Sequence, residues 1–122
     1  CRALSPHNRN LTDEMIRALA EKGGIAGLNY CASFVDADSA HPKLCRSTVE
    51  RLAKHAAHFK QVGGIEVISL GSDFDGISHP PYNLHGVQDY SAVYEYLSKK
   101  YSASTVEKIT HKNVLNLLQK VL

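Results

Sequence analysis

The 122-residue sequence lacks the features that mark several broad classes of protein. Its apolar stretches fall well short of the roughly 18 residues needed to cross a bilayer, so no membrane-spanning segment is expected. The net charge is only +2 and no run of Lys or Arg exceeds two residues, which argues against a nucleic-acid-binding surface. The three cysteines include no Cys-x-x-Cys pair, so we expect reduced thiols and a cytoplasmic protein.

The common catalytic motifs are also missing. There is no Gly-rich phosphate loop, no Gly-x-Ser-x-Gly, no His-Glu-x-x-His and no His-x-Asp. His55 and His58 share one helix face but have no carboxylate beside them, so we expect them to face solvent instead of a metal ion. His79 and His85 lie in a loop and could line a pocket. The sequence therefore predicts no metal ligands within this chain.

Caps and apolar periodicity predict several helices. Thr12 is the expected N-cap of the first helix, which the glycine pair at 23–24 ends. The pattern Ser-x-x-Glu at 47–50 and again at 104–107 predicts two capping boxes, each opening a further helix. A helix between them is predicted over residues 90–100.

Two apolar runs, at 25–30 and 65–70, predict strands. They show no strict alternation of polar and apolar residues, which is typical of buried parallel strands. Helices between parallel strands imply right-handed βαβ units. Two strands alone leave open sheet edges, and a (β/α)8 barrel needs about 250 residues. We therefore expect an α/β fold in which residues 1–122 form the C-terminal segment of one larger domain, the rest of which is absent from this chain.

Asp73 is the main candidate catalytic residue, because it directly follows the second predicted strand. The C-terminal edge of such strands carries the chemistry in barrel enzymes. Asp73, and even more so Asp75, could instead serve as ordinary turn residues. The flanking Gly71 and Gly76 indicate a backbone that passes close to another group. Arg9 lies in a polar loop before the first helix and could bind a carboxylate, or could be a plain surface residue.

Several segments together resemble a known family. The N-terminal stretch 1–16, with Pro6-His7-Asn8-Arg9-Asn10 followed by Leu-Thr-Asp-Glu, is similar to the membrane (renal-type) dipeptidases, and so is the stretch 24–30. The strongest match is the Gly-Ser-Asp-Phe-Asp-Gly motif at 71–76. The resemblance extends over essentially the whole chain. It implies a (β/α)8 TIM barrel of the metal-dependent hydrolase type, with two zinc ions, that hydrolyses dipeptides.

The resemblance also implies roles for two residues. Arg9 matches the Arg that binds the C-terminal carboxylate of the dipeptide. Asp73 matches the Asp that passes a proton from the bridging water to the leaving amine. The metal ligands of the family are not in this chain, so the isolated chain is expected neither to bind zinc at that site nor to hydrolyse dipeptides. Asn8 and His111 depart from the residues usual in the family, and the loop 78–85 differs too, which puts the substrate preference in doubt.

Other interpretations remain open from the sequence. The parent could be a different amidohydrolase-type enzyme, which would have a lysine as metal bridge in its upstream sequence. It could also be a barrel homologue that has lost its metal ligands and serves as a binding or assembly module. The chain itself could be a proteolytic product. The expected partners are a dipeptide substrate and either the missing half of the barrel or a second copy.

Overall fold

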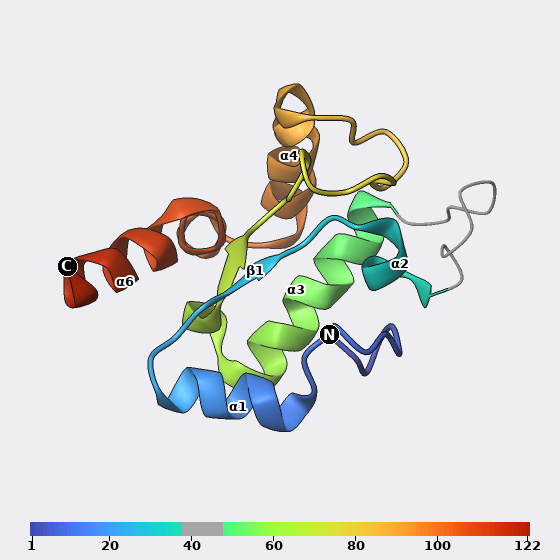
Figure 1. Ribbon diagram of the computed structural model, residues 1–122. Coiled ribbons are helices and arrows are strands. Elements are labelled where there is room, and N and C mark those ends of the chain that lie inside the picture. The colour runs from blue at the N-terminus through green and yellow to red at the C-terminus, as the bar shows by residue number, and fades with distance from the viewer. Residues whose placement is uncertain (38–47) are drawn as a thin grey trace.

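The computed structural model describes residues 1–37 and 48–122, which fold into two strands surrounded by helices (Figure 1). The helices and strands, in chain order, are α1 (Asp13–Glu21), β1 (Ala26–Leu28), α2 (Ala32–Val35), α3 (Val49–Gly63), β2 (Ile68–Leu70), α4 (Tyr90–Lys100), α5 (Ala103–Glu107) and α6 (Asn113–Val121). Short 3-10 turns, η3 (Ile65–Val67) and η4 (Val87–Asp89), precede β2 and α4, and a π-helical segment, η5 (Lys108–Lys112), joins α5 to α6.

The strands β1 and β2 pair in parallel, with Ala26 opposite Ile68 and Leu28 opposite Leu70. The predicted α/β class with parallel strands is therefore confirmed. Both strands are shorter than predicted, and the first part of the second run forms the 3-10 turn η3. A distant side chain holds this turn at the start of β2: Asn113 donates hydrogen bonds to the carbonyl oxygens of Ile65 (2.7 Å) and Ile68 (2.8 Å).

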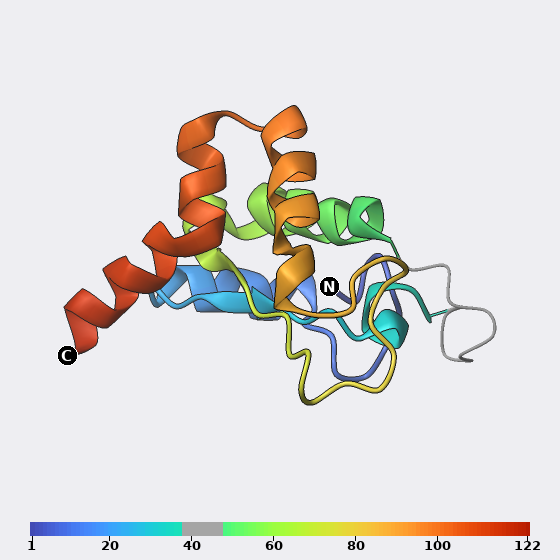
Figure 2. The same cartoon turned by 90° about the horizontal axis from the view of Figure 1, so that it is seen from above.

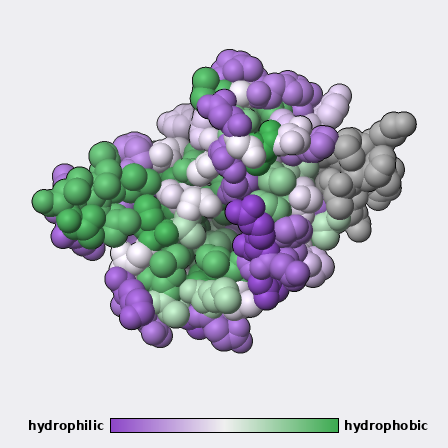
Figure 3. Space-filling view, viewed as in Figure 1, coloured by the Kyte–Doolittle hydropathy of each residue, from purple (hydrophilic) through white to green (hydrophobic). Residues whose placement is uncertain are grey.

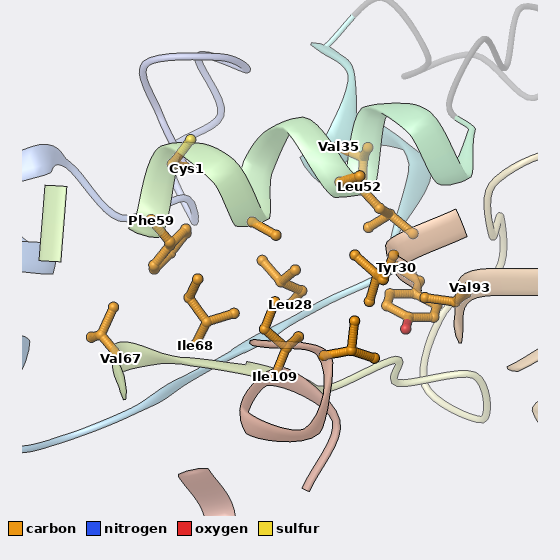
Figure 4. Packing of buried hydrophobic residues seen from close by; sticks show 14 of the residues in the cluster. Cys1, Leu28, Tyr30, Val35, Leu52, Phe59, Val67, Ile68, Val93 and Ile109 are labelled. Carbon is orange, nitrogen blue, oxygen red and sulfur yellow. The ribbon is translucent and has the colours of Figure 1, made fainter. Parts of the chain in front are cut away.

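The long helix α3 covers one face of the strand pair. Figure 4 shows Leu52 and Phe59 of α3 close to Leu28 and Ile68 of the strands, in the space between helix and strands. All four side chains are almost completely buried. Burying apolar surface contributes about 25 cal/mol per Å², so this layer supplies much of the driving force for folding.

The helix ends partly confirm the predicted caps. The hydroxyl of Thr12 accepts a hydrogen bond from Met15 N (3.3 Å), and Gly23 has φ +68 directly after α1. The two predicted capping boxes are wrong. Thr48 caps α3, one residue after the predicted position, and Ser102 caps α5, two residues before it. In both cases the capping residue has extended backbone and its hydroxyl accepts from the N–H three residues on.

Two elements were not predicted. The segment 32–35, expected to be loop, forms α2, and the break expected between the last two helices is bridged by η5. Cys45 and Ser47, which entered the sequence predictions, lie outside the described residues. Across residues 1–37 and 48–122, no helix combines the length and the apolar character that a bilayer-crossing segment requires.

The terminal helix α6 extends away from the rest of the molecule (Figures 1 and 2). Its apolar side chains are exposed, with Leu115 at 52% and Val121 at 66%. Figure 3 shows these apolar side chains gathered over α6, at the left of the molecule. An amphipathic helix of this kind normally buries its apolar face against another element.

Candidate functional site

The parallel ladder continues past both strands and brings their carboxyl ends together. Gly71 N donates to Leu28 O (3.1 Å), and Tyr30 N donates to Ser72 O (3.0 Å). Asn29, just after β1, therefore lies beside Asp73, which follows β2 after Gly71 and Ser72. Because β1 and β2 are parallel, their carboxyl ends lie at the same edge of the sheet, and these two polar groups meet there.

The carboxylate of Asp73 is held in one place by its surroundings. Asn29 Nδ2 donates to Asp73 Oδ2 at 2.8 Å. The backbone of Asp73 has φ +67, a left-handed conformation that Asp tolerates better than most residues, and Asp73 O accepts from Gly76 N (3.0 Å). A side chain at Gly76 would collide with the carboxylate of Asp73. Asp73 is itself exposed, so its carboxylate is accessible to a ligand.

The glycines of the motif permit close backbone contact. A Cβ at Gly71 would lie 3.0 Å from the Cα of Gly27, and a Cβ at Gly27 would lie 3.1 Å from the Cα of Gly71. The prediction that Gly71 and Gly76 mark places where the backbone passes close to another group is therefore confirmed. Glycine at these positions leaves the surface between the two strand ends free of side chains.

Arg9 projects from the loop that precedes α1. Its Cζ lies 5.2 Å from the centre of the Phe34 ring, and the His7 ring packs on the same ring at 4.5 Å. Asn10 ties this loop to α2, because its Nδ2 donates to Ser5 O (2.9 Å) and Phe34 O (2.7 Å). Arg9 is exposed and forms no ion pair with a carboxylate within the described parts of the chain. Its guanidinium therefore remains available to bind an anion.

Arg9 and Asp73 line two different hollows. Arg9 and Asn29 line the first, a hollow of about 170 Å³ between the N-terminal loop, β1 and α3. Asp73 lines the second, of about 510 Å³, together with Asp75 and His85. Asn29 links the two, since it lines the first and hydrogen-bonds Asp73 of the second. In Figure 2 the N-terminal loop (dark blue) and the loop after β2 (yellow) lie on the same side of α3, whereas Figure 1 shows β1 and α2 between them, with the yellow loop next to α4.

The predictions for the histidines were only partly right. His55 is buried and not solvent-facing: its Nε2 donates to Val35 O (2.8 Å), and its Nδ1 lies 2.6 Å from Cys1 N. Burial lowers the pKa of His55 to about 4. His58 is half-buried and pairs with Asp13 of α1 at 2.7 Å. Both histidines thus connect α3 to neighbouring segments.

Among the loop histidines, for which a pocket-lining position was only one possibility, His85 lines the hollow beside Asp73. His79 is exposed, and its carbonyl oxygen accepts from Ala32 N (2.8 Å). Asn29 was missed by the sequence reasoning, although a polar residue at the end of the first strand could have identified it. No group of three or more His, Cys, Asp or Glu side chains within residues 1–37 and 48–122 is arranged to hold a metal ion.

The chain is similar in sequence and structure to known dipeptidases and metallopeptidases. The dipeptidase aclJ of Aspergillus oryzae is 35% identical over 123 residues, which cover 95% of this chain and 27% of the relative. A metallopeptidase from Rhodobacter sphaeroides, solved with a phosphinate mimic of the dipeptide L-Ala-D-Ala, matches with a TM-score of 0.87 and 28% identity, covering 99% of this chain and 34% of that one. The M19 metallopeptidase called dipeptidase AC matches with the same TM-score and identity, over 97% of this chain and 34% of its own.

These matches also confirm the fold, since the M19 metallopeptidases are TIM-barrel proteins and the two parallel strands with their helices superpose on part of them. The chain spans between 27% and 43% of the length of the curated relatives it matches. The family model of the membrane dipeptidases, peptidase family M19, matches residues 1–122. The chain therefore belongs to the membrane dipeptidase family.

Proposed function

We propose that residues 1–122 form the C-terminal segment of one TIM-barrel metallodipeptidase domain and supply its substrate-binding and proton-transfer groups. The observation that carries this proposal is the arrangement of Arg9 and Asp73, which lie on two hollows joined by Asn29 at the carboxyl ends of parallel strands. That edge is where barrel enzymes hold their active sites. The dipeptide mimic bound by the Rhodobacter sphaeroides relative supports a dipeptide as the substrate class.

Arg9 binds the C-terminal carboxylate of the dipeptide in this proposal. A guanidinium presents a fork that matches a carboxylate in two parallel hydrogen bonds. The stacking on Phe34 fixes the direction of the side chain, and the contacts of Asn10 hold the loop on which it sits. Because a longer peptide has no free carboxylate at this position, Arg9 also selects for dipeptides.

Asp73 transfers the proton. Its Oδ2 is bound by Asn29, which leaves Oδ1 to accept a proton from the attacking water and to deliver it to the amide nitrogen that leaves. A carboxylate that must face first a water and then a nitrogen needs a fixed position. The left-handed backbone of Asp73 and the empty space above Gly76 supply that position.

The membrane dipeptidase family implies a metal cofactor. The described residues do not fit a metal ion, because they contain no group of three or more His, Cys, Asp or Glu side chains that could hold it. We place the metal, proposed to be two zinc ions, on the remainder of the barrel. The isolated chain is accordingly expected to lack dipeptidase activity.

The remainder of the barrel is also the proposed partner of the exposed apolar side chains on α6. With 42% of Leu118 and 66% of Val121 exposed, this helix has an apolar face that the described residues leave uncovered. Covering such a face removes apolar surface from water. A second copy of the protein is the alternative occupant, and the oligomeric state of the whole protein distinguishes the two.

The test uses the whole protein and two matched substrates, a dipeptide and its C-terminal amide. We expect the dipeptide to be hydrolysed and the amide to be a poor substrate. Arg9→Met should lower kcat/KM for the dipeptide by about 100-fold, as loss of a charge-assisted pair of hydrogen bonds predicts, and should remove the preference over the amide. Arg17→Met, which changes an exposed Arg on α1, is the control and should leave kcat/KM for both substrates unchanged.

Asp73→Asn tests the proton-transfer role and should lower kcat. Absence of any dipeptide hydrolysis by the wild type would contradict the proposal and favour a non-catalytic homologue.

A further inference from the structure

We propose that Asn29 is a positioning residue that acts on the reaction through the carboxylate of Asp73. This inference rests on the proposed function, because it gives Asn29 a role in the same proton transfer. Asn29 emerges from the end of β1, whereas Asp73 follows β2, so the contact joins residues 44 positions apart in the sequence.

The amide of Asn29 is fixed at both of its ends. Its Oδ1 accepts a hydrogen bond from Cys31 N at 2.7 Å, and its Nδ2 donates to Asp73 Oδ2 at 2.8 Å. An Asn side chain has one acceptor end and one donor end, and only the acceptor end can pair with a backbone N–H. The contact with Cys31 therefore determines that the donor end faces Asp73 and prevents the amide from turning over.

The absence of a side chain at Gly76 leaves room for the same carboxylate. The three atoms closest to a Cβ built at Gly76 are all carboxyl-group atoms of Asp73: Oδ1 is closest, followed by Cγ at 3.0 Å and Oδ2 at 3.3 Å. Gly76 does not have a positive φ, so its backbone would accept alanine. Asn29 on one side and Gly76 on the other therefore define where the carboxylate of Asp73 can lie.

This arrangement commits Oδ2 to Asn29 and leaves Oδ1 for the transferred proton. Proton transfer requires donor and acceptor within about 3 Å, and a displacement of about 1 Å at a reacting group can cost roughly 100-fold in rate. Asn29 thus contributes to catalysis through the carboxylate of Asp73.

The decisive variant is Asn29→Asp in the whole protein. Asp is nearly the same shape and still accepts from Cys31 N, so the loop after β1 is retained. It replaces the donor that faces Asp73 by an oxygen, which repels the carboxylate. We expect kcat for a dipeptide to fall about 100-fold, because the proton-transferring carboxylate is displaced. KM should rise less than kcat falls, since Arg9 itself is retained although Asn29 lines the same hollow. Asn116→Asp, on an exposed part of α6, is the control for the added charge and should leave kcat unchanged.

Gly76→Ala tests the same carboxylate without altering charge. It should also lower kcat, with little change in the unfolding temperature, because the group it displaces is the end of a side chain. Wild-type kcat in both Asn29→Asp and Gly76→Ala would overturn the inference.

A double-mutant cycle separates positioning from a purely structural role. Combined with Asp73→Asn, the change Asn29→Asp should cost no further activity, since the carboxylate through which it acts is gone. The same combination should recover the unfolding temperature that Asn29→Asp alone loses, because the amide introduced at position 73 can donate to the carboxylate introduced at position 29. Additive losses of kcat, or additive shifts of the unfolding temperature, would overturn the inference. If the wild-type protein has no dipeptidase activity, the proposed function is wrong. The unfolding temperatures of the four proteins in the cycle would still show whether the side chains at positions 29 and 73 pair with each other.

Discussion

The side chain of Asn113 is predicted to make a large contribution to stability, because it donates to two backbone carbonyl oxygens at the start of β2. Asn113 opens α6 and is only 3% exposed. Its Nδ2 donates to the carbonyl oxygens of Ile65 and Ile68, on either side of the turn that leads into β2. Truncation to alanine would leave both carbonyl groups without this donor, and water reaches the buried oxygen of Ile68 poorly.

The expected cost follows from these two hydrogen bonds. A buried polar group left unsatisfied costs about 1–3 kcal/mol, and the contact to Ile65 is only partly buried, so it counts for less. Alanine regains roughly 0.5 kcal/mol through its better helix propensity. The net loss for Asn113→Ala is therefore about 2–3 kcal/mol.

Urea unfolding followed by circular dichroism measures this difference directly. Asn116→Ala is the matched control, because it makes the same change one turn later on the same helix at an exposed position. It should leave stability unchanged or raise it slightly. If Asn113→Ala loses no more than Asn116→Ala, the carbonyl oxygens of Ile65 and Ile68 have other partners and the reasoning fails.

Two further predictions concern pH and backbone packing. Burial lowers the pKa of His55 from 6.5 to about 4, so the unfolded state binds more protons than the folded state between these pH values. The free energy of unfolding should therefore fall by up to roughly 3 kcal/mol as pH drops from 6.5 to 4. Urea titrations at several pH values should show this contribution of His55 to the pH dependence, and it should be absent in His55→Gln. Gly71→Ala should destabilise by about 1–3 kcal/mol, because its Cβ would press on the backbone of Gly27, which cannot move aside; an unchanged urea midpoint would show that the strand ends separate freely.

The sequence was sufficient to predict the elements whose signals are local. The helix predicted over residues 90–100 has these bounds in the structure, and Thr12 caps α1 as expected. The two apolar runs correctly identified parallel strands, but the turn before β2 is held by Asn113, a residue more than 40 positions away from β2. Nothing in the run 65–70 itself indicates that its first half forms a turn.

In the candidate site, too, residues with a local sequence signal could be predicted and residues that depend on distant contacts could not. Asp73 could be identified because glycines flank it directly after an apolar run. Asn29 could have been noticed as a polar residue at the end of the first strand, but its contact with Asp73 depends on the register between β1 and β2, which the sequence alone does not give. His55 was wrongly expected to face solvent, since a histidine without a nearby carboxylate suggests exposure. Its partner is the carbonyl of Val35, supplied by the end of a helix that was not predicted either.

The central claim is that Arg9 and Asp73 serve one substrate from adjacent hollows. A crystal structure of the whole protein with a phosphinate dipeptide mimic tests it most directly. The account predicts the carboxylate of the mimic within about 2.7–2.9 Å of the Arg9 guanidinium, with the phosphinate group next to Asp73 and the Asn29 contact intact. A mimic bound with its carboxylate on another cation, and with Arg9 and Asp73 both turned away from it, would contradict the account.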